Sequence, residues 1–298
     1  MYKTVKTTTE QALREVGLDP AAVVAFVRAA IDEDLNGGED VTSVATIDPA
    51  ATSVADFVVR GNGVIAGVPV LRATVESMLG TATIETYVHD GDRVERGTIV
   101  ATVRAATIEL LTVERTALNL LCRLSGVATH TRNWVDALNG TNTRVRDTRK
   151  TTPGMRDLEK YAVRCGGGVN HRRGLSDAVL IKDNHVLAAG GVGAALDAVH
   201  RRFADRALVV QTEIDRLDQL DEALDHGANQ ILLDNMSVAD MRVAVERVRS
   251  RHSNVLLEAS GGLTLSNAAD IAATGVDFIA VGALTHSSPI LDIALDFR

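Results

Sequence analysis

Three neighbouring segments decide the fold and the chemistry of this chain: Asp147-Thr-Arg-Lys-Thr-Thr-Pro-Gly154, Cys165-Gly-Gly-Gly-Val-Asn-His171-Arg172-Arg-Gly174 and Leu180-Ile-Lys182-Asp-Asn-His185. Residues 147–185 hold eight Lys and Arg against five Asp and Glu, whereas the full chain holds 31 against 39. Glycine and proline between the cations let backbone N–H groups approach an anion closely. The region therefore predicts a site for a small, multiply charged anion.

Residues 156–164 lie between these motifs and show a different pattern, with acidic and basic residues interspersed as on ordinary helix surfaces. We interpret them as a helix with a solvated charged face. The segments Thr148–Gly154 and Gly166–Gly174 lack helical periodicity, and three consecutive glycines are poor helix formers. Their cations are therefore interpreted as binding groups.

The second half of the chain alternates short β-type runs with helix-compatible segments such as Ser237–Arg251 and Ser266–Thr274, as in parallel βαβ units. Six runs are expected to be strands: Arg144–Arg146, Ala178–Ile181, Ala207–Val210, Gln230–Leu233, Asn254–Leu257 and Asp277–Val281. Polar or glycine residues follow them at Asp147, Lys182, Gln211 to Glu213, Asp234, Glu258 and Gly282. Because the carboxyl ends of the strands in an α/β barrel meet at one face, these groups are expected to converge there.

The first half of the chain has the pattern of an antiparallel sheet. Alternating β-type residues between Phe57 and Val103 are broken by glycine-containing turns, and a helix is expected around Val70–Leu79. A further helical segment, Ile108–Leu124, leads to the second half.

Composition excludes several classes of protein. The net charge of −8 and the aromatic content of 3% argue against a nucleic-acid partner. No apolar run approaches the roughly 20 residues that span a bilayer, and the first residues lack the apolar stretch of a secretory signal. Two cysteines provide no disulfide framework and no zinc-binding spacing. An enzyme of the cytoplasm, without a membrane partner, is the expectation.

Further motifs at Glu33–Thr42, Glu114–Leu120, Leu257–Gly262 and Val281–Ala283 extend the pattern over essentially the whole chain. With the three segments quoted above, they resemble the quinolinate phosphoribosyltransferases, the carboxylating nicotinate-nucleotide pyrophosphorylases of NAD biosynthesis.

The resemblance implies a fold in two parts. An N-terminal open-faced α/β sandwich is expected at residues 1–125, rejoined by about residues 287–298. An incomplete, TIM-like α/β barrel of six to seven strands is expected at residues 126–286 and would carry the transferase site.

The implied reaction joins quinolinate to 5-phosphoribosyl-1-pyrophosphate (PRPP), releasing pyrophosphate and then CO2 to leave nicotinate mononucleotide. Quinolinate has two adjacent carboxylates, which suit the forked donors of arginine. The resemblance assigns to it Arg149, Arg172 and Arg115, with Thr148 and His171 as further donors. Lys150 and Lys182 are expected at the junction of the two substrates, where a point charge stabilises departing pyrophosphate and the anion left by CO2.

Two carboxylates, Glu213 and Asp234, are expected near the ribose hydroxyls and a Mg2+ ion carried by the pyrophosphate, so that no firm protein metal site is predicted. An alternative for Asp234 is the N-cap of the helix that begins near Ser237. The chain has Gln211-Thr-Glu213 where the family commonly has Glu-x-Glu, which leaves a metal or positioning role at position 211 in doubt.

Two glycine-containing turns are expected to hold the 5′-phosphate, because backbone N–H groups at helix N-termini bind anions. They are Ser260, Gly261 and Gly262 in one turn and Val281, Gly282 and Ala283 in the other. His286 is assigned to pyrophosphate, with a plain surface position as the alternative.

The resemblance also implies a homodimer in which Arg115 completes the quinolinate site of the neighbouring chain, with a hexamer as a larger assembly. Three other activities stay open: the related molybdenum-associated proteins of the same fold, a nicotinate-type transferase, and a barrel lyase that forms a Schiff base at Lys182.

Overall fold

The computed structural model describes residues 2–79, 82–251 and 254–298. The chain forms two compact units. The first consists of Met1–Arg132, Thr151–Gly167 and Leu284–Arg298, and the second of Asn133–Lys150 and Gly168–Ala283. Each unit is made of segments that are separate in the sequence. The domain ranges expected from the sequence, residues 1–125 and 126–286, therefore stay a prediction.

The first unit is built on an antiparallel sheet in the order β12-β1-β5-β3. Its strands are β1 (Thr52–Val59), β3 (Thr83–Thr86), β5 (Ile99–Ala106) and β12 (Ile293–Phe297). The central strand β1 pairs with β5 on one side and with the C-terminal β12 on the other, as the pairs Ala55–Val103 and Ala55–Phe297 show. The expected antiparallel sheet and its closure by the end of the chain are confirmed.

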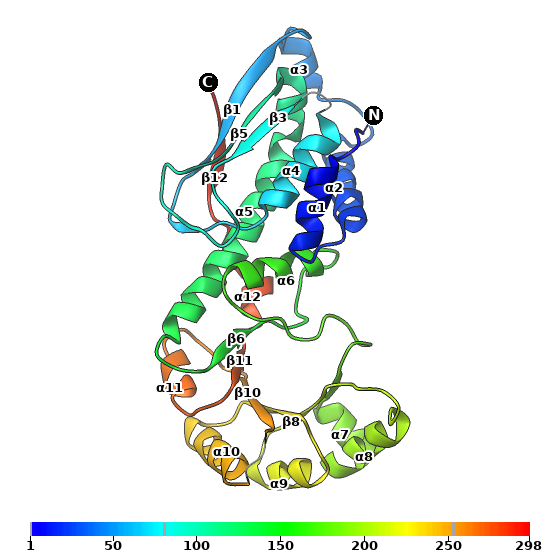
Figure 1. The fold of residues 1–298 in the computed structure, drawn as a ribbon, viewed down its shortest axis with the longest axis vertical. Coiled ribbons are helices and arrows are strands. Elements are labelled where there is room, and N and C mark those ends of the chain that lie inside the picture. The colour runs from blue at the N-terminus through cyan, green and yellow to red at the C-terminus, as the bar shows by residue number, and fades with distance from the viewer. Residues whose placement is uncertain (1, 80–81, 252–253) are drawn as a thin grey trace. The chain divides into compact units, whose positions relative to one another are not determined.

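Helix α4 (Val68–Met78) lies beside this sheet, and α1 (Thr7–Glu15) and α2 (Pro20–Leu35) pack against α4 (Figure 1). The N-terminal part also contains α3 (Val41–Thr46) and the small pair β2 (Gly63–Val64) and β4 (Arg93–Val94). The expected helix near Val70–Leu79 is thus confirmed as α4. Helix α5 (Thr107–Ala137) runs well past the expected end at Leu124, because buried apolar residues such as Val127 and Trp134 continue its periodicity.

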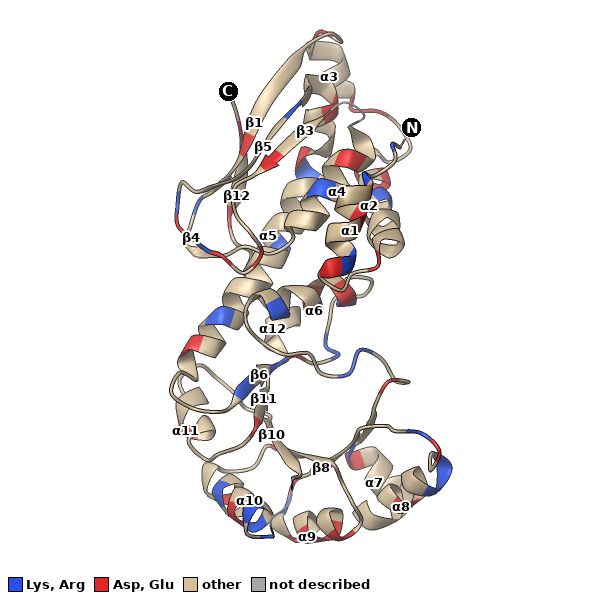
Figure 2. Cartoon of the chain, in the orientation of Figure 1, with Lys and Arg blue, Asp and Glu red and all other residues tan. Residues whose placement is uncertain are grey.

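The second unit is a parallel sheet of six strands in the order β6-β11-β10-β9-β8-β7. The strands are β6 (Arg144–Arg146), β7 (Val179–Ile181), β8 (Val210–Ile214), β9 (Gln230–Asp234), β10 (Leu256–Ser260) and β11 (Phe278–Ala280). Their connecting helices are α7 (Asp183–Ala189), α8 (Val192–Arg202), α9 (Leu217–Asp225), α10 (Val238–Ser250) and α11 (Ala268–Ala272). Helices α8 to α11 lie outside the curved sheet (Figure 1), as in an incomplete barrel. Charged residues of both signs occur on α10 (Figure 2).

The two faces of this sheet differ in polarity. Ile231, Leu257 and Ile279 point to the helices and are fully buried. The opposite face carries polar side chains, including Gln211 and Glu213 on β8. This pattern explains two shifted strands. The sequence predicted Ala207–Val210 and Asn254–Leu257, ending at the first polar residue, but inward-facing polar residues belong to β8 and β10.

Helix α6 (Arg156–Cys165) is present where residues 156–164 predicted a helix, but two of its charged residues are buried. Glu159 and Lys160 are only 0% and 4% exposed. Glu159 accepts hydrogen bonds from Arg123 Nη2 at 2.7 Å and from the backbone N and Oγ1 of Thr152 at 2.9 and 2.8 Å. The prediction of a solvated face was wrong for Glu159 and Lys160, because the charge pattern of a helix does not reveal a partner far away in the sequence.

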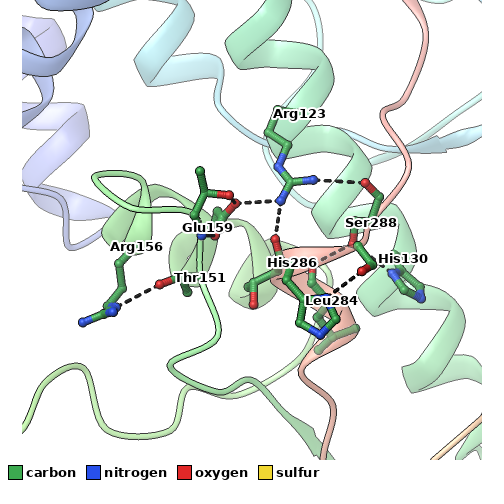
Figure 3. A network of polar contacts seen from close by, with 11 residues as sticks. Arg123, His130, Thr151, Arg156, Glu159, Leu284, His286 and Ser288 are labelled. Carbon is green, nitrogen blue, oxygen red and sulfur yellow. Dashed lines mark hydrogen bonds and ion pairs between the residues drawn. The ribbon is translucent and has the colours of Figure 1, made fainter.

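The network around Glu159 also reaches the C-terminal segment (Figure 3). Arg123 donates to the backbone carbonyls of Ser288, at 3.0 Å, and of Thr285. Ser288 in turn binds the carbonyl of Leu284 and lies 2.8 Å from Nδ1 of His130. Arg123 therefore links α6 to the short helix α12 (Ala283–His286) and the residues after it.

Candidate active site

The carboxyl ends of the six parallel strands form one edge of the second unit, and the polar residues singled out in the sequence lie along it. Asp147 follows β6, Lys182 follows β7, Glu213 lies near the end of β8, and Asp234 and Ser260 end β9 and β10. The loop after β6 carries a basic stretch (Figure 2). The strand order places Lys182, Glu213 and Asp234 on three adjacent strands.

Two of the predicted arginines act on each other. Burial lowers the pKa of Arg172, and the nearby positive charge of Arg149 lowers it further, with Asp177 opposing the shift. Nη1 of Arg172 donates to the carbonyl of Ala178 at 3.1 Å. Two cations held close together in a half-buried position favour an anion between or beside them.

His171 is held at both ends by buried residues. Its backbone N donates to Oδ1 of Asp147 at 2.7 Å, and its ring Nε2 lies 2.6 Å from Oε1 of Gln211. Oδ2 of Asp147 accepts from the amide of Asn170 at 2.6 Å. Asp147 is fully buried and Gln211 is 2% exposed. Gln211 is thus a buried partner of His171, and a neutral amide at this position suits an imidazole ring.

Lys182, Glu213 and Asp234 form a mixed charge cluster. Burial raises the pKa of Glu213, the negative charge of Asp234 raises it further, and the positive charge of Lys182 opposes this. Neither Lys182 nor Glu213 makes an ion pair with any residue in the part of the chain that the structure describes. Lys182 is exposed and forms the N-cap of α7. Its backbone N donates a hydrogen bond to Nδ1 of His185 at 3.0 Å.

Asp234 is not a helix cap, contrary to the alternative considered from the sequence. The N-cap of α10 is Ser237, whose side chain accepts from the backbone N of Asp240 at 3.1 Å. Asp234 accepts a hydrogen bond from the side chain of Asn235 at 2.7 Å. Ser237 is the N-cap because it lies directly before Val238, the first residue of α10.

The two predicted phosphate turns follow the neighbouring strands β10 and β11. Gly261 and Gly262 adopt φ angles of +85° and +62°, in the left-handed region that favours glycine. Val281 donates its backbone N to the carbonyl of Arg146 at 2.9 Å, which ties the second turn to β6. Gly282 and Ala283 follow at the end of this unit.

Two predicted site residues belong to the first unit. Arg115 is exposed on α5 and makes no hydrogen bond or ion pair among the described residues; its positive charge opposes the burial that raises the pKa values of Glu114 and Cys122. Arg115 therefore has no acidic side chain in direct contact among the described residues. His286, at the end of α12, is exposed, and its Nδ1 lies 2.6 Å from Oγ of Ser287.

One strand-end carboxylate has a structural partner. Glu258 accepts from Nη1 of Arg146 at 2.6 Å, and the same nitrogen donates to Gln230 at 3.1 Å. The guanidinium of Arg146 also stacks 3.4 Å from the ring centroid of Phe278. The sequence predicted that Glu258 would converge with the other polar residues at the strand ends, but its charge is paired with that of Arg146 within the sheet.

The sequence did not single out Asn170, Asn235 or the binding role of Asp147. Only Asp147 carried a signal, its position directly after a predicted strand. Among the described residues, no three His, Cys, Asp or Glu side chains are grouped so as to hold a metal. None of the described helices is both long and apolar enough to cross a membrane.

Comparison with known proteins identifies the family. The C-terminal domain model of quinolinate phosphoribosyl transferase matches residues 127–296, and the N-terminal domain model matches residues 40–125. The chain is 52% identical to the nicotinate-nucleotide pyrophosphorylase [carboxylating] of Mycobacterium leprae over 91% of this chain and 95% of that protein. It is 38% identical to the probable enzyme of that name from Bacillus subtilis over 89% of each chain.

A solved structure agrees with this assignment. The nicotinate-nucleotide pyrophosphorylase of Francisella tularensis superposes with a TM-score of 0.89 at 35% identity, over 94% of this chain and 98% of that one. Family models that together span residues 40–296 and a relative that shares half of its residues leave one assignment. The chain belongs to the quinolinate phosphoribosyltransferase family.

Proposed function

We propose that this chain transfers the phosphoribosyl group of PRPP to quinolinate and releases pyrophosphate and CO2, forming nicotinate mononucleotide for de novo synthesis of NAD. Membership of the family supports this activity, that of EC class 2.4.2.19. The observation that carries the proposal is the set of opposite charges at one sheet edge, where the cations Arg149, Arg172 and Lys182 occur with the carboxylates Glu213 and Asp234.

The arginines fit the two carboxylates of quinolinate. Each guanidinium offers a planar pair of donors, and the mutual repulsion of Arg149 and Arg172 is relieved when a dianion binds between them. Thr148 and His171 supply further polar groups beside them. The contact between the ring of His171 and the side chain of Gln211 fixes the orientation of the ring.

The lysines and carboxylates fit the second substrate. Breaking the ribosyl C1–O bond gives the ring positive character, which carboxylates such as Glu213 and Asp234 stabilise, while Lys150 and Lys182 stabilise the departing pyrophosphate and the anion left by CO2. Mg2+ enters as part of the PRPP substrate; two carboxylates on adjacent strands suit an ion that keeps most of its water.

The remaining phosphate groups fit the glycine turns. Ser260, Gly261 and Gly262 and the turn of Val281, Gly282 and Ala283 offer backbone N–H donors to the 5′-phosphate. His286 offers a ring nitrogen to pyrophosphate. The cytoplasmic location expected from the sequence remains part of this proposal.

The decisive experiment follows products. We expect the protein to convert quinolinate, PRPP and Mg2+ to nicotinate mononucleotide with one CO2 per turnover, and to leave nicotinate almost untouched, because nicotinate presents one carboxylate to several arginines. Equal turnover of nicotinate, or pyrophosphate release without CO2, would contradict the proposal. Borohydride trapping of a carbonyl substrate at Lys182 would favour the Schiff-base alternative.

A dimer forms the second part of the proposal, with Arg115 of one chain completing the quinolinate site of its partner. The exposure of Arg115 and its lack of a contacting partner among the described residues support this. Arg115→Ala and Lys182→Ala homodimers should each be nearly inactive, whereas mixed dimers should regain one intact site. No recovery in verified heterodimers would place Arg115 in the site of its own chain.

A further inference from the structure

We propose that Asn235 is a positioning residue of the transferase site, which fixes the carboxylate of Asp234 against the turn of Gly261 and Gly262. This inference rests on the proposed function, because both neighbours are assigned there to PRPP. Asn235 itself is assigned to no substrate.

The backbone of Asn235 is unusual. Its φ angle is +53°, and Asn36, with +46°, is the other residue besides glycine with a positive φ in the described part of the chain. Asparagine adopts this left-handed conformation more readily than most residues do. At Asn235 the conformation directs the side chain back toward the end of β9.

Asn235 contacts both neighbours. Its side-chain amide donates to Oδ2 of Asp234 at 2.7 Å, and its backbone N donates to the carbonyl of Ser260 at 2.9 Å. One carboxylate oxygen of Asp234 is thereby held by an internal donor, and the end of β9 is joined to the turn that follows β10. A hydrogen bond to a charged acceptor is among the stronger kinds in proteins.

Gly261 is shaped to accept this side chain. A Cβ atom at Gly261 would lie 2.1 Å from Oδ1 of Asn235, and the φ angle of +85° disfavours any other residue as well. The amide of Asn235 therefore occupies the space that a side chain at Gly261 would need. The carboxylate and the glycine turn are held in register by one amide group.

Asn36 is a natural control. It forms the left-handed C-cap of α2, and its side chain makes no hydrogen bond among the described residues. A left-handed asparagine can thus serve a turn without any side-chain contact. The two hydrogen bonds and the close packing at Asn235 exceed what a turn requires.

The test compares Asn235→Gly, Asn235→Asp and Asn36→Gly. Glycine keeps the backbone conformation and removes the amide, whereas aspartate keeps the shape but replaces the donor with a charge that repels Asp234. We expect the KM for PRPP to rise about tenfold in Asn235→Gly and about a hundredfold in Asn235→Asp, in line with loss of a hydrogen bond to a charged group. The KM for quinolinate, and both constants in Asn36→Gly, should change less than about twofold.

A second measurement does not depend on turnover. Mg2+ and PRPP should raise the Tm of the wild-type protein, and this increase should be smaller in both Asn235 variants. Without ligand, the Tm of the Asn235 variants should match that of Asn36→Gly. Equal shifts in all variants, a wild-type KM in Asn235→Asp, or equal losses for both substrates with a lowered Tm would each overturn the inference. A wild-type protein that binds PRPP but forms no product would refute the proposed function and leave this inference standing on the binding data.

Discussion

A glutamate lies close to a basic side chain in two regions of the molecule, around Glu159 and around Glu213, but the surroundings of the two carboxylates differ. The carboxylate of Glu159 is fully buried and paired with the half-buried guanidinium of Arg123, and both of its oxygens accept hydrogen bonds. Around Glu213, a carboxylate and the ammonium of Lys182 affect each other only through space. A charge saturated by the protein supports structure, while a charge whose partners are missing from the described residues is available to a substrate.

The Arg146–Glu258 pair sharpens this contrast, because it lies in the same sheet as Glu213. Glu258 of β10 and Glu213 of β8 lie on the same face of the sheet, on either side of β9, where each is paired with Leu232. Glu258 is 1% exposed and bonded to Arg146, whereas Glu213 is half-buried. The two carboxylates therefore differ in their partners and not in the face of the sheet that they occupy.

The largest expected effect is a loss of stability when the hydrogen-bonded network around Glu159 is broken. Glu159→Ala leaves Arg123 and Thr152 without their acceptor, and removing one member of a buried ion pair costs roughly 3–5 kcal/mol of unfolding free energy. Urea denaturation measures this. The control is Glu10→Ala, which removes an exposed i,i+4 partner of Arg14 and should cost below about 0.5 kcal/mol.

A double variant tests the physical reason. Arg123→Met with Glu159→Leu removes both charges and keeps the volume apolar, so most of the lost stability should return. A double variant as unstable as Glu159→Ala would show that the hydrogen bonds to Thr152, Thr285 and Ser288 matter more than the charge pair.

Substitution of the exposed lysines at the sheet edge should reduce activity and leave stability nearly unchanged. Lys182→Ala and Lys150→Ala are expected to lower kcat/KM by on the order of 10²-fold or more, about 2.7 kcal/mol of transition-state stabilisation, with little change in Tm because both side chains are exposed. Arg201→Ala removes an exposed cation from α8 and serves as the control. Near-normal turnover of a lysine variant would place that lysine outside the chemistry.

Much of the fold was predictable because it depends on local patterns. Strand β6 begins and ends at the predicted residues, and the alternation of strands and helices fixed a parallel sheet. The errors at β8 and β10 have one cause, since an apolar-run rule ends a strand at its first inward-facing polar residue. Interior polarity of a sheet cannot be inferred from hydrophobic runs alone.

The positions of polar residues at the sheet edge were predictable where a residue type and a strand end coincide, as at Lys182 and Asp234. The role of a residue was not predictable where it depends on a distant partner. The buried state of Glu159 requires Arg123, and that of Glu258 requires Arg146, which lie 36 and 112 residues away in sequence. Asn235 carries no pattern at all, because its role arises from a backbone angle and from Gly261.

The smallest expected effect concerns Asp90, a carboxylate that is neither saturated by a cation nor open to substrate. It accepts hydrogen bonds from the backbone N of Val68 at 3.0 Å and from the hydroxyl of Tyr161, while burial raises its pKa to about 6. In the unfolded chain the pKa of aspartate is about 3.9. Between these values the folded protein binds the proton more tightly than the unfolded chain does.

The stabilisation from protonated Asp90 is therefore complete below about pH 4 and is lost as the pH rises through 6. We expect this residue to lower the unfolding free energy by on the order of 1 kcal/mol between pH 5 and pH 7. Other carboxylates, such as Asp40 and Asp177, have lowered pKa values and act in the opposite direction at more acidic pH. The measurement is thus the difference in urea stability between the wild type and Asp90→Asn across this range. Asparagine stays neutral, so its advantage over the wild type should grow with pH; a difference that does not change with pH would mean that Asp90 is already ionised in the folded protein at pH 5.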